Sequence, residues 1–107
     1  MKNILQIEKI LLEELNIIIK ELNQEIYFNF GYPREDNICL EKINNIWYVY
    51  YTERGKKVRI KEYETLYGAC INVIDRLSET NELYEKYKEM FEQKLRRKWY
   101  IWLIIMK

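Results

Sequence analysis

The chain has 107 residues, which is enough for one domain with its own hydrophobic core, and we expect a single domain over residues 1–107. Eighteen Lys and Arg residues against 17 Asp and Glu residues leave a formal charge of +1, which excludes a strong overall field that would draw the molecule onto nucleic acid or an anionic membrane. Ten tyrosines, one proline and three glycines favour a packed, ordered chain.

The cysteines and the chain ends predict a cytoplasmic location. Cys39 and Cys70 show neither C-x-x-C spacing nor the density of a secreted disulfide scaffold, so we expect reduced thiols. Residues 1–24 alternate apolar and charged groups without the apolar segment of a signal peptide. The longest apolar run, residues 99–106, is too short to span a membrane.

The first segment is predicted to be an amphipathic helix over about residues 3–24. Apolar side chains recur there at steps of three and four residues, and polar side chains form the opposite stripe. The apolar positions are Ile4, Ile7, Leu11, Leu15, Ile18 and Leu22. A coiled-coil partner is the less favoured alternative, because fewer than four heptads are available.

Four strand-like runs follow the first helix. Residues 26–30 favour a first strand that stops at Gly31-Tyr32-Pro33. Three further runs, residues 38–43, 46–52 and 57–62, are separated by Asn44-Asn45 and by a second turn that contains Gly55. Asn and Gly tolerate the left-handed conformation of tight hairpins, so the pattern predicts a β-meander.

The register of these strands divides the aromatic segment between two faces. A two-residue turn at Asn44-Asn45 places Leu40 opposite Val49, and an even second connection places Ile60 opposite Val49 on the other side. The predicted core face carries Ile38, Leu40, Trp47, Val49, Tyr51, Val58 and Ile60. The predicted outer face carries Cys39, Glu41, Tyr48, Tyr50, Thr52, Lys57, Arg59 and Lys61. An odd loop with a bulge at Gly55 would turn Arg59 and Lys61 inward, and the apolar pattern favours the even register.

Two helices are predicted after the strands. Thr65 is a good N-cap for a helix over residues 66–78, and the polar residues 78–81 offer a second cap before helical spacing resumes from Leu83 to about residue 98. The predicted fold class is therefore α+β: an N-terminal helix, a three- to four-stranded antiparallel meander, and two C-terminal helices. We expect these two helices to pack mainly on the Trp47/Val49/Tyr51 face.

No catalytic, metal or cofactor site is predicted. The chain has no histidine, which removes the commonest general base, the Ser-His and Cys-His pairs and most zinc sites. Carboxylates lie in charge-patterned helices or near turns, where solvation explains them, and Cys70 lies on an apolar helical stripe. We therefore expect a protein that is not an enzyme.

The outer face of the meander offers three interpretations. Tyr48 and Tyr50 beside Lys57, Arg59 and Lys61 could stack bases and bind phosphates. The same composition suits a protein interface, where Tyr and Arg dominate the contact energy. Alternatively, a helix covers the face, or the tyrosines only fill cross-strand positions.

The apolar tail of residues 99–106 follows the cations of residues 96–98. Cations beside indoles suit a lipid interface, but such a tail more often ends a buried helix or adds a strand to a sheet edge. If the tail is exposed, it needs a partner, for example a second copy of the chain in a homodimer.

The central segment combines several features in a fixed order. These are the string Trp47-x-Val49-Tyr50-Tyr51-x-Glu53-Arg54-Gly55, an aromatic residue at Tyr63, a capped helix that opens at Thr65, and Ala69-Cys70 before Leu77. With these features the segment, less than half of the chain, resembles the small cytoplasmic immunity proteins of bacterial polymorphic toxin and contact-dependent growth inhibition systems.

The resemblance implies a protein with no activity of its own that binds one cognate toxin domain, commonly a nuclease, and blocks its active site or substrate path. The predicted partner-binding residues are Tyr48, Tyr50, Arg54, Arg59 and Lys61, and Trp47 is predicted to be structural. The alternatives are a nucleic-acid-binding module that uses the same tyrosine and basic face, and a self-associating structural domain that uses the C-terminal tail.

Overall fold

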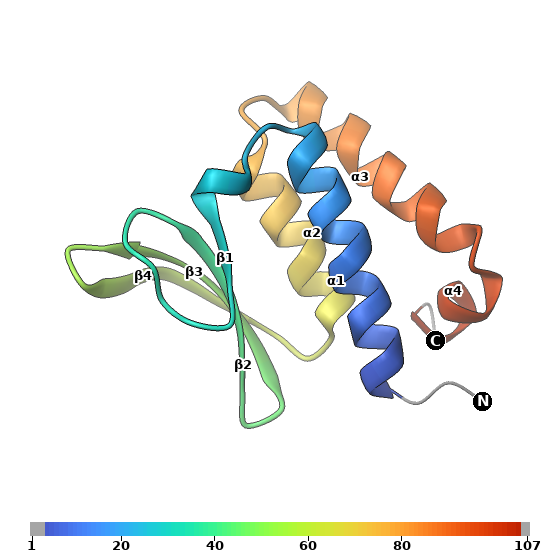
Figure 1. Cartoon of the computed structure of the whole chain (residues 1–107), viewed down its shortest axis with the longest axis horizontal. Helices are drawn as coiled ribbons and strands as arrows, with labels where there is room; N and C mark the ends of the chain where they lie inside the picture. The colour runs from blue at the N-terminus through green and yellow to red at the C-terminus, as the bar shows by residue number, and fades with distance from the viewer. Residues whose placement is uncertain (1–3, 106–107) are drawn as a thin grey trace.

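The computed structural model describes residues 4–105 and places the elements in three layers (Figure 1). In chain order these are α1 (Ile4–Glu21), the 3-10 turn η1 (Glu25–Tyr27), β1 (Phe28–Phe30), β2 (Ile38–Ile43), β3 (Ile46–Glu53), β4 (Lys56–Tyr63), α2 (Leu66–Leu77), α3 (Asn81–Arg96) and α4 (Trp99–Ile105). The sheet forms one layer, α1 and α2 form the middle layer, and α3 packs on the far side of these two helices. The α+β class is thus confirmed. Residue 3 of the predicted first helix and residue 106 of the tail lie outside the described residues.

The helices begin at the predicted caps. The Thr65 side chain accepts a hydrogen bond from the Gly68 N–H at 3.2 Å, and the Thr80 side chain accepts one from the Leu83 N–H at 3.1 Å. Each bond satisfies a donor that the first helical turn leaves unpaired. The last predicted helix corresponds to α3, which ends at Arg96, and the tail forms the separate helix α4 after a short turn.

The sheet is mixed, which corrects the prediction of a purely antiparallel meander. The strand order is β1-β2-β3-β4, and β1 pairs with β2 in parallel, with Phe28 beside Ile38. Residues 31–37 return the chain to the start of β2, and the Gly31 N–H still bonds to the Leu40 carbonyl at 2.8 Å. Strand propensity predicts that residues 28–30 are extended, but it does not indicate their direction.

The two hairpins use the predicted tight turns. Ile43 pairs with Ile46, and Leu40 pairs with Val49, as predicted for the β2–β3 register. Asn44 and Asn45 both have positive φ, as do Arg54 and Gly55 in the second hairpin. Two consecutive residues with positive φ are what a type I′ turn requires, and this turn matches the twist of the flanking strands.

The register of β4 departs from the prediction at a bulge. Val58 pairs with Tyr51 as predicted, but Lys61 lies opposite Val49, where Ile60 was expected. Arg59 has a φ of 52° and is the extra residue. The prediction was wrong beyond this point because one extra residue inverts every later side chain. Lys61 therefore faces the helices, and Ile60 is 51% exposed on the outer face.

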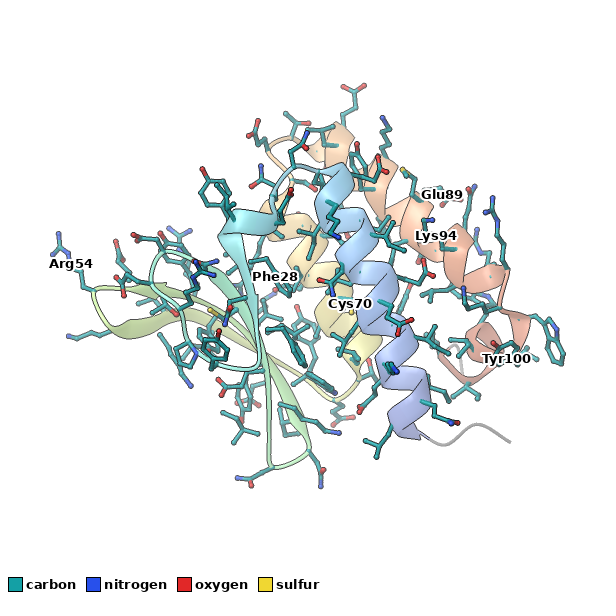
Figure 2. The ribbon with its side chains drawn as sticks, viewed as in Figure 1. Phe28, Arg54, Cys70, Glu89, Lys94 and Tyr100 are labelled. Carbon is teal, nitrogen blue, oxygen red and sulfur yellow. The ribbon has the colours of Figure 1, made fainter. Side chains whose placement is uncertain are left out.

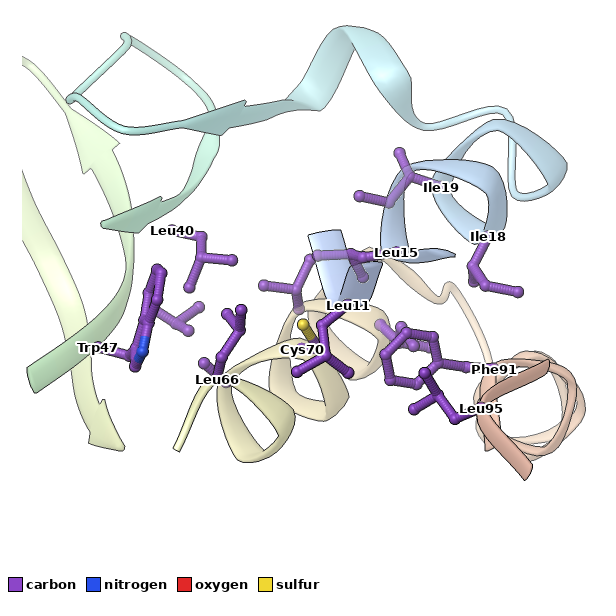
Figure 3. Close-up of a cluster of buried hydrophobic side chains, with 14 of the residues drawn as sticks. Leu11, Leu15, Ile18, Ile19, Leu40, Trp47, Leu66, Cys70, Phe91 and Leu95 are labelled. Carbon is purple, nitrogen blue, oxygen red and sulfur yellow. The ribbon is translucent and has the colours of Figure 1, made fainter. Parts of the chain in front are cut away.

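The core lies between the sheet and the helical layers (Figure 3). Leu40 and Trp47 contribute from the sheet, and Cys70 contributes from α2, where burial raises the pKa of its thiol. The remaining labelled members are Leu11, Leu15, Ile18 and Ile19 from α1, Leu66 from α2, and Phe91 and Leu95 from α3. Helix α3 packs on α1 and α2, so the expectation that both later helices pack mainly on the sheet holds only for α2.

Candidate functional site

A pocket of about 770 Å³ opens between the sheet and the C-terminal half of α2. We call it the α2–sheet pocket. Its lining residues are Gln24, Tyr27, Asp36, Ile38, Tyr51, Glu53, Val58, Arg59, Lys61, Asn72, Asp75, Arg76 and Leu77. This volume falls in the range of clefts that accept small ligands or partner side chains.

The floor of the pocket is formed by residues that were predicted to be core. Ile38, Tyr51 and Val58 share the helix-facing side of three neighbouring strands, but all three are only half-buried. They were predicted to lie on the core face, and they do, but α2 leaves them half-buried because it lines the pocket with Asn72, Asp75 and Arg76 beside Leu77. The apolar residues on the helix-facing side of the sheet thus extend beyond the part of the sheet that α2 buries.

The wall of the pocket holds polar groups without protein partners. The Arg76 Nη2 donates to the Arg59 carbonyl oxygen at 2.6 Å. Within the described part of the chain, however, the buried Arg76 Nη1 and the buried Asn72 Oδ1 have no hydrogen-bond partner. Removal from water lowers the pKa of Arg76, yet a guanidinium remains charged at neutral pH. The wall therefore offers a charged donor and a neutral acceptor.

The charges that line the pocket are balanced. Three carboxylates, Asp36, Glu53 and Asp75, accompany three cations, Arg59, Lys61 and Arg76. The Tyr51 O–H donates to the Asp36 Oδ1 at 3.2 Å. Desolvation, followed by this hydrogen bond, raises the pKa of Tyr51. The lining therefore has no net charge, and recognition of a ligand depends on individual contacts.

Arg54 lies at the tip of the β3–β4 hairpin, at the edge of the molecule (Figure 2). The backbone N–H groups of Arg54 and Gly55 donate to the two carboxylate oxygens of Glu35, the Gly55 bond at 3.0 Å. Glu35 thus joins the hairpin tip to the loop of residues 31–37. The Arg54 side chain is exposed beyond this contact and can reach a partner.

Tyr50 lies on the outer face, and the expectation that it is exposed was wrong. Its side chain is fully buried, and its O–H donates to the Glu41 Oε1 at 2.7 Å. Lys57 Nζ lies 4.8 Å from the ring centroid and 3.2 Å from the same carboxylate oxygen. Desolvation, with the Glu41 hydrogen bond as the next cause, raises the pKa of Tyr50.

The loop of residues 31–37 covers this part of the outer face. Cys39, predicted on the wetter face, is fully buried, and its Sγ lies 3.8 Å from the Arg34 carbonyl oxygen and 3.6 Å from the Thr52 Oγ1. Tyr48 is half-buried two pairs further along the sheet, on the same face. The alternative that a helix covers the outer face was therefore wrong around Tyr50, where a loop provides the cover.

The structure separates the five predicted partner-binding residues into three places. Arg59 and Lys61 line the α2–sheet pocket, Arg54 lies at the hairpin tip, and Tyr48 and Tyr50 belong to the opposite face. Their contact with a partner stays a prediction. Sequence reasoning did not identify the wall residues Asn72, Asp75 and Arg76, and the available signal was a polar pair spaced four residues apart beside the apolar stripe of α2.

The C-terminal tail forms α4, a short helix that packs on α3. Ile101 is buried, whereas Trp99, Leu103 and Ile104 are 68%, 56% and 49% exposed. Lys98 forms an ion pair with the buried Glu14 of α1 at 3.2 Å, which holds the start of α4 against the helical layer. No helix in residues 4–105 has the length and apolar character that crossing a bilayer requires.

Comparisons with known proteins add no family to these observations. No protein-family model matches the sequence, and neither a curated protein nor a solved structure shows significant similarity to the chain. Within the described residues, no group of three or more His, Cys, Asp or Glu side chains is placed to hold a metal ion. The resemblance to immunity proteins stays a prediction.

Proposed function

We propose that this chain is an inhibitory binding protein whose partner is a toxin domain, and that the mouth of the α2–sheet pocket contacts that partner. The toxin class comes from the resemblance of the central segment to immunity proteins. The proposal does not require activity of the chain itself, because occupation of the toxin's active site or substrate path is sufficient for inhibition.

One observation carries the proposal: the β3–β4 hairpin groups three predicted recognition residues beside a pocket with an exposed tyrosine. Arg59 and Lys61 line the pocket, Arg54 extends from the tip, and Tyr27 in the lining is 49% exposed. Arginine and tyrosine provide a large part of the binding energy in protein interfaces, because both combine apolar area with directed hydrogen bonds.

The proposal is tested first by capture from the native host. The tagged chain should recover one protein with a toxin-like domain, both with and without nuclease treatment, and the purified chain should suppress that protein's activity. A nuclease toxin is the first activity to assay. Recovery that disappears on nuclease treatment would instead support the nucleic-acid-binding alternative.

Charge reversal then tests the surface. The double variant Arg54→Glu, Lys61→Glu should weaken toxin binding by about tenfold or more, since both side chains are exposed on the proposed surface. Arg97→Glu, an exposed position just after α3, is the control and should bind as the unmodified chain does. Equal binding of the double variant and the control would sink the surface assignment.

A further inference from the structure

We infer that the α2–sheet pocket is a receptor for one acidic side chain of a peptide segment, held by Arg76 and Asn72 of α2. This inference rests on the proposed function, because it names the chemistry by which a protein partner would enter the pocket. It concerns two residues of the helix wall that lie outside the central hairpin used in the proposal above.

The Arg76 guanidinium has one nitrogen, Nη2, fixed by a hydrogen bond and one, Nη1, that is buried without a partner in the described chain. Its Nη2 is held by the Arg59 carbonyl oxygen at 2.6 Å, and the positive φ of Arg59 at the bulge sets the position of that carbonyl. A carboxylate is the acceptor that best suits the Nη1 donor, because the bond is charge-assisted and the guanidinium is already oriented.

The ligand must also offer a donor close to its carboxylate. Asn72 lies one helical turn before Arg76, and its buried Oδ1 accepts no bond within residues 4–105. A peptide that carries an aspartate satisfies both groups, since its side-chain carboxylate lies a short distance from backbone N–H groups. Acidic peptide segments therefore fit the pair better than an isolated anion does.

The other charges of the pocket admit no more than one negative group, because three carboxylates stand against two cations besides Arg76. Asp36, Glu53 and Asp75 repel a second anion, and they balance the three cations of the lining. The pocket therefore lacks the net positive field that would concentrate small anions or phosphates. A monovalent carboxylate held by direct hydrogen bonds fits this balance, whereas a phosphate dianion does not.

The test is a chemical-shift titration of the isotope-labelled full chain at pH 7 and constant ionic strength. The probe is N-acetyl-aspartic acid N-methylamide, and the matched neutral probe is the corresponding asparagine derivative. The aspartate probe should shift the backbone signals of Asn72, Arg76 and Arg59–Lys61 and bind at least about tenfold more tightly than the asparagine probe. N-acetylglycine, with a terminal carboxylate, and inorganic phosphate should bind more weakly than the aspartate probe.

Variants connect the binding to Arg76. Arg76→Gln should weaken binding of the aspartate probe by about tenfold or more, whereas Arg97→Gln should leave it unchanged. The dispersion of each spectrum reports whether the variant is folded. If Arg76→Gln disrupts the fold, Arg76→Lys retains the charge without the planar fork, and it should still show a measurable loss of affinity.

Several results would overturn the inference. These are equal binding of the aspartate and asparagine probes, tighter binding of N-acetylglycine or phosphate, and an Arg76 variant that is folded and binds like the unmodified chain. Failure of the toxin capture with intact aspartate binding would refute the proposed function and leave the carboxylate receptor standing. Toxin inhibition without aspartate binding would support the proposed function and refute the carboxylate receptor.

Discussion

The helix-facing surface of the sheet has a closed end and an open end. At the closed end, Trp47 and Val49 are almost completely buried, and Leu66 of α2 lies beside Trp47 (Figure 3). At the open end, Tyr51 on the same strand and the same face lines the α2–sheet pocket and is only half-buried. A few residues along one strand thus separate core from candidate site.

The two ends show that the burial of a strand residue depends on the helix that covers it as well as on the face it occupies. Alternation along β3 assigns Trp47, Val49 and Tyr51 to one face, and this assignment is correct. Whether a position is buried depends on the side chains that α2 places near it: Trp47 shares the core with the apolar residues of α2, whereas the pocket at Tyr51 is lined largely by polar ones. The proposed binding surface occurs where the covering layer changes from apolar to polar.

The largest expected effect on stability comes from removing an aromatic ring, and we compare its removal at the closed end with its removal at the open end. Trp47→Ala should lower the free energy of unfolding by roughly 3–5 kcal/mol, because it leaves a cavity in the packed core. Tyr51→Ala should lower it by about 1 kcal/mol, because its ring already borders an open pocket. Urea denaturation of both variants measures the difference. Similar losses would contradict the distinction between the closed and open ends.

A pH titration extends the comparison to the outer face, where Tyr50 is buried although other residues of that face are exposed. Burial raises the pKa of Tyr50 above 10, so the folded chain keeps this proton at a pH where the unfolded chain has lost it. The stability that depends on Tyr50 is therefore fully present below about pH 10 and declines as the pH rises further, by at most about 1.4 kcal/mol per pH unit.

Tyr50→Phe tests this dependence. The variant should be less stable at pH 7, because the half-buried Glu41 carboxylate loses the Tyr50 donor and keeps only Lys57. Its decline above pH 10 should be shallower than that of the unmodified chain. Tyr32→Phe, at a side chain that is 60% exposed, is the control and should keep the original slope. Thermal unfolding between pH 8 and pH 11 provides the measurement, and an unchanged slope in Tyr50→Phe would contradict the burial of this hydroxyl.

Sequence patterns predicted most of the elements because their signals are local. Apolar spacing and the threonine caps located α1, α2 and α3, and the Asn44-Asn45 turn set the β2–β3 register. The parallel direction of β1 was not predictable, since it depends on where residues 31–37 cross the sheet. The sequence also left several alternatives for residues 99–106, because the position of α4 depends on its packing against α3.

The candidate site was predicted only in part. Arg59 and Lys61 were selected for their charge, but the reason given, a shared outer face with Tyr48 and Tyr50, was wrong because of the bulge. An arginine carries no local signal for a bulge, whereas glycine often does. Arg76 appeared in the sequence as one more polar residue on a helix, and its role in the pocket depends on the sheet that lies opposite.

The smallest expected effect concerns the bulge that helps to shape the open end. Arg59 adopts a φ of 52°, where a side chain costs about 1 kcal/mol and glycine costs almost nothing. Arg59→Gly should therefore stabilise the chain by about 0.5–1 kcal/mol, whereas Ile60→Gly in the adjacent extended position should destabilise it by a similar amount. Because the Arg59 carbonyl remains in place for Arg76, Arg59→Gly should retain most of the binding of the aspartate probe. Destabilisation by Arg59→Gly, measured by urea denaturation, would show that the positive φ does not persist in solution and that Ile60 pairs opposite Val49 after all.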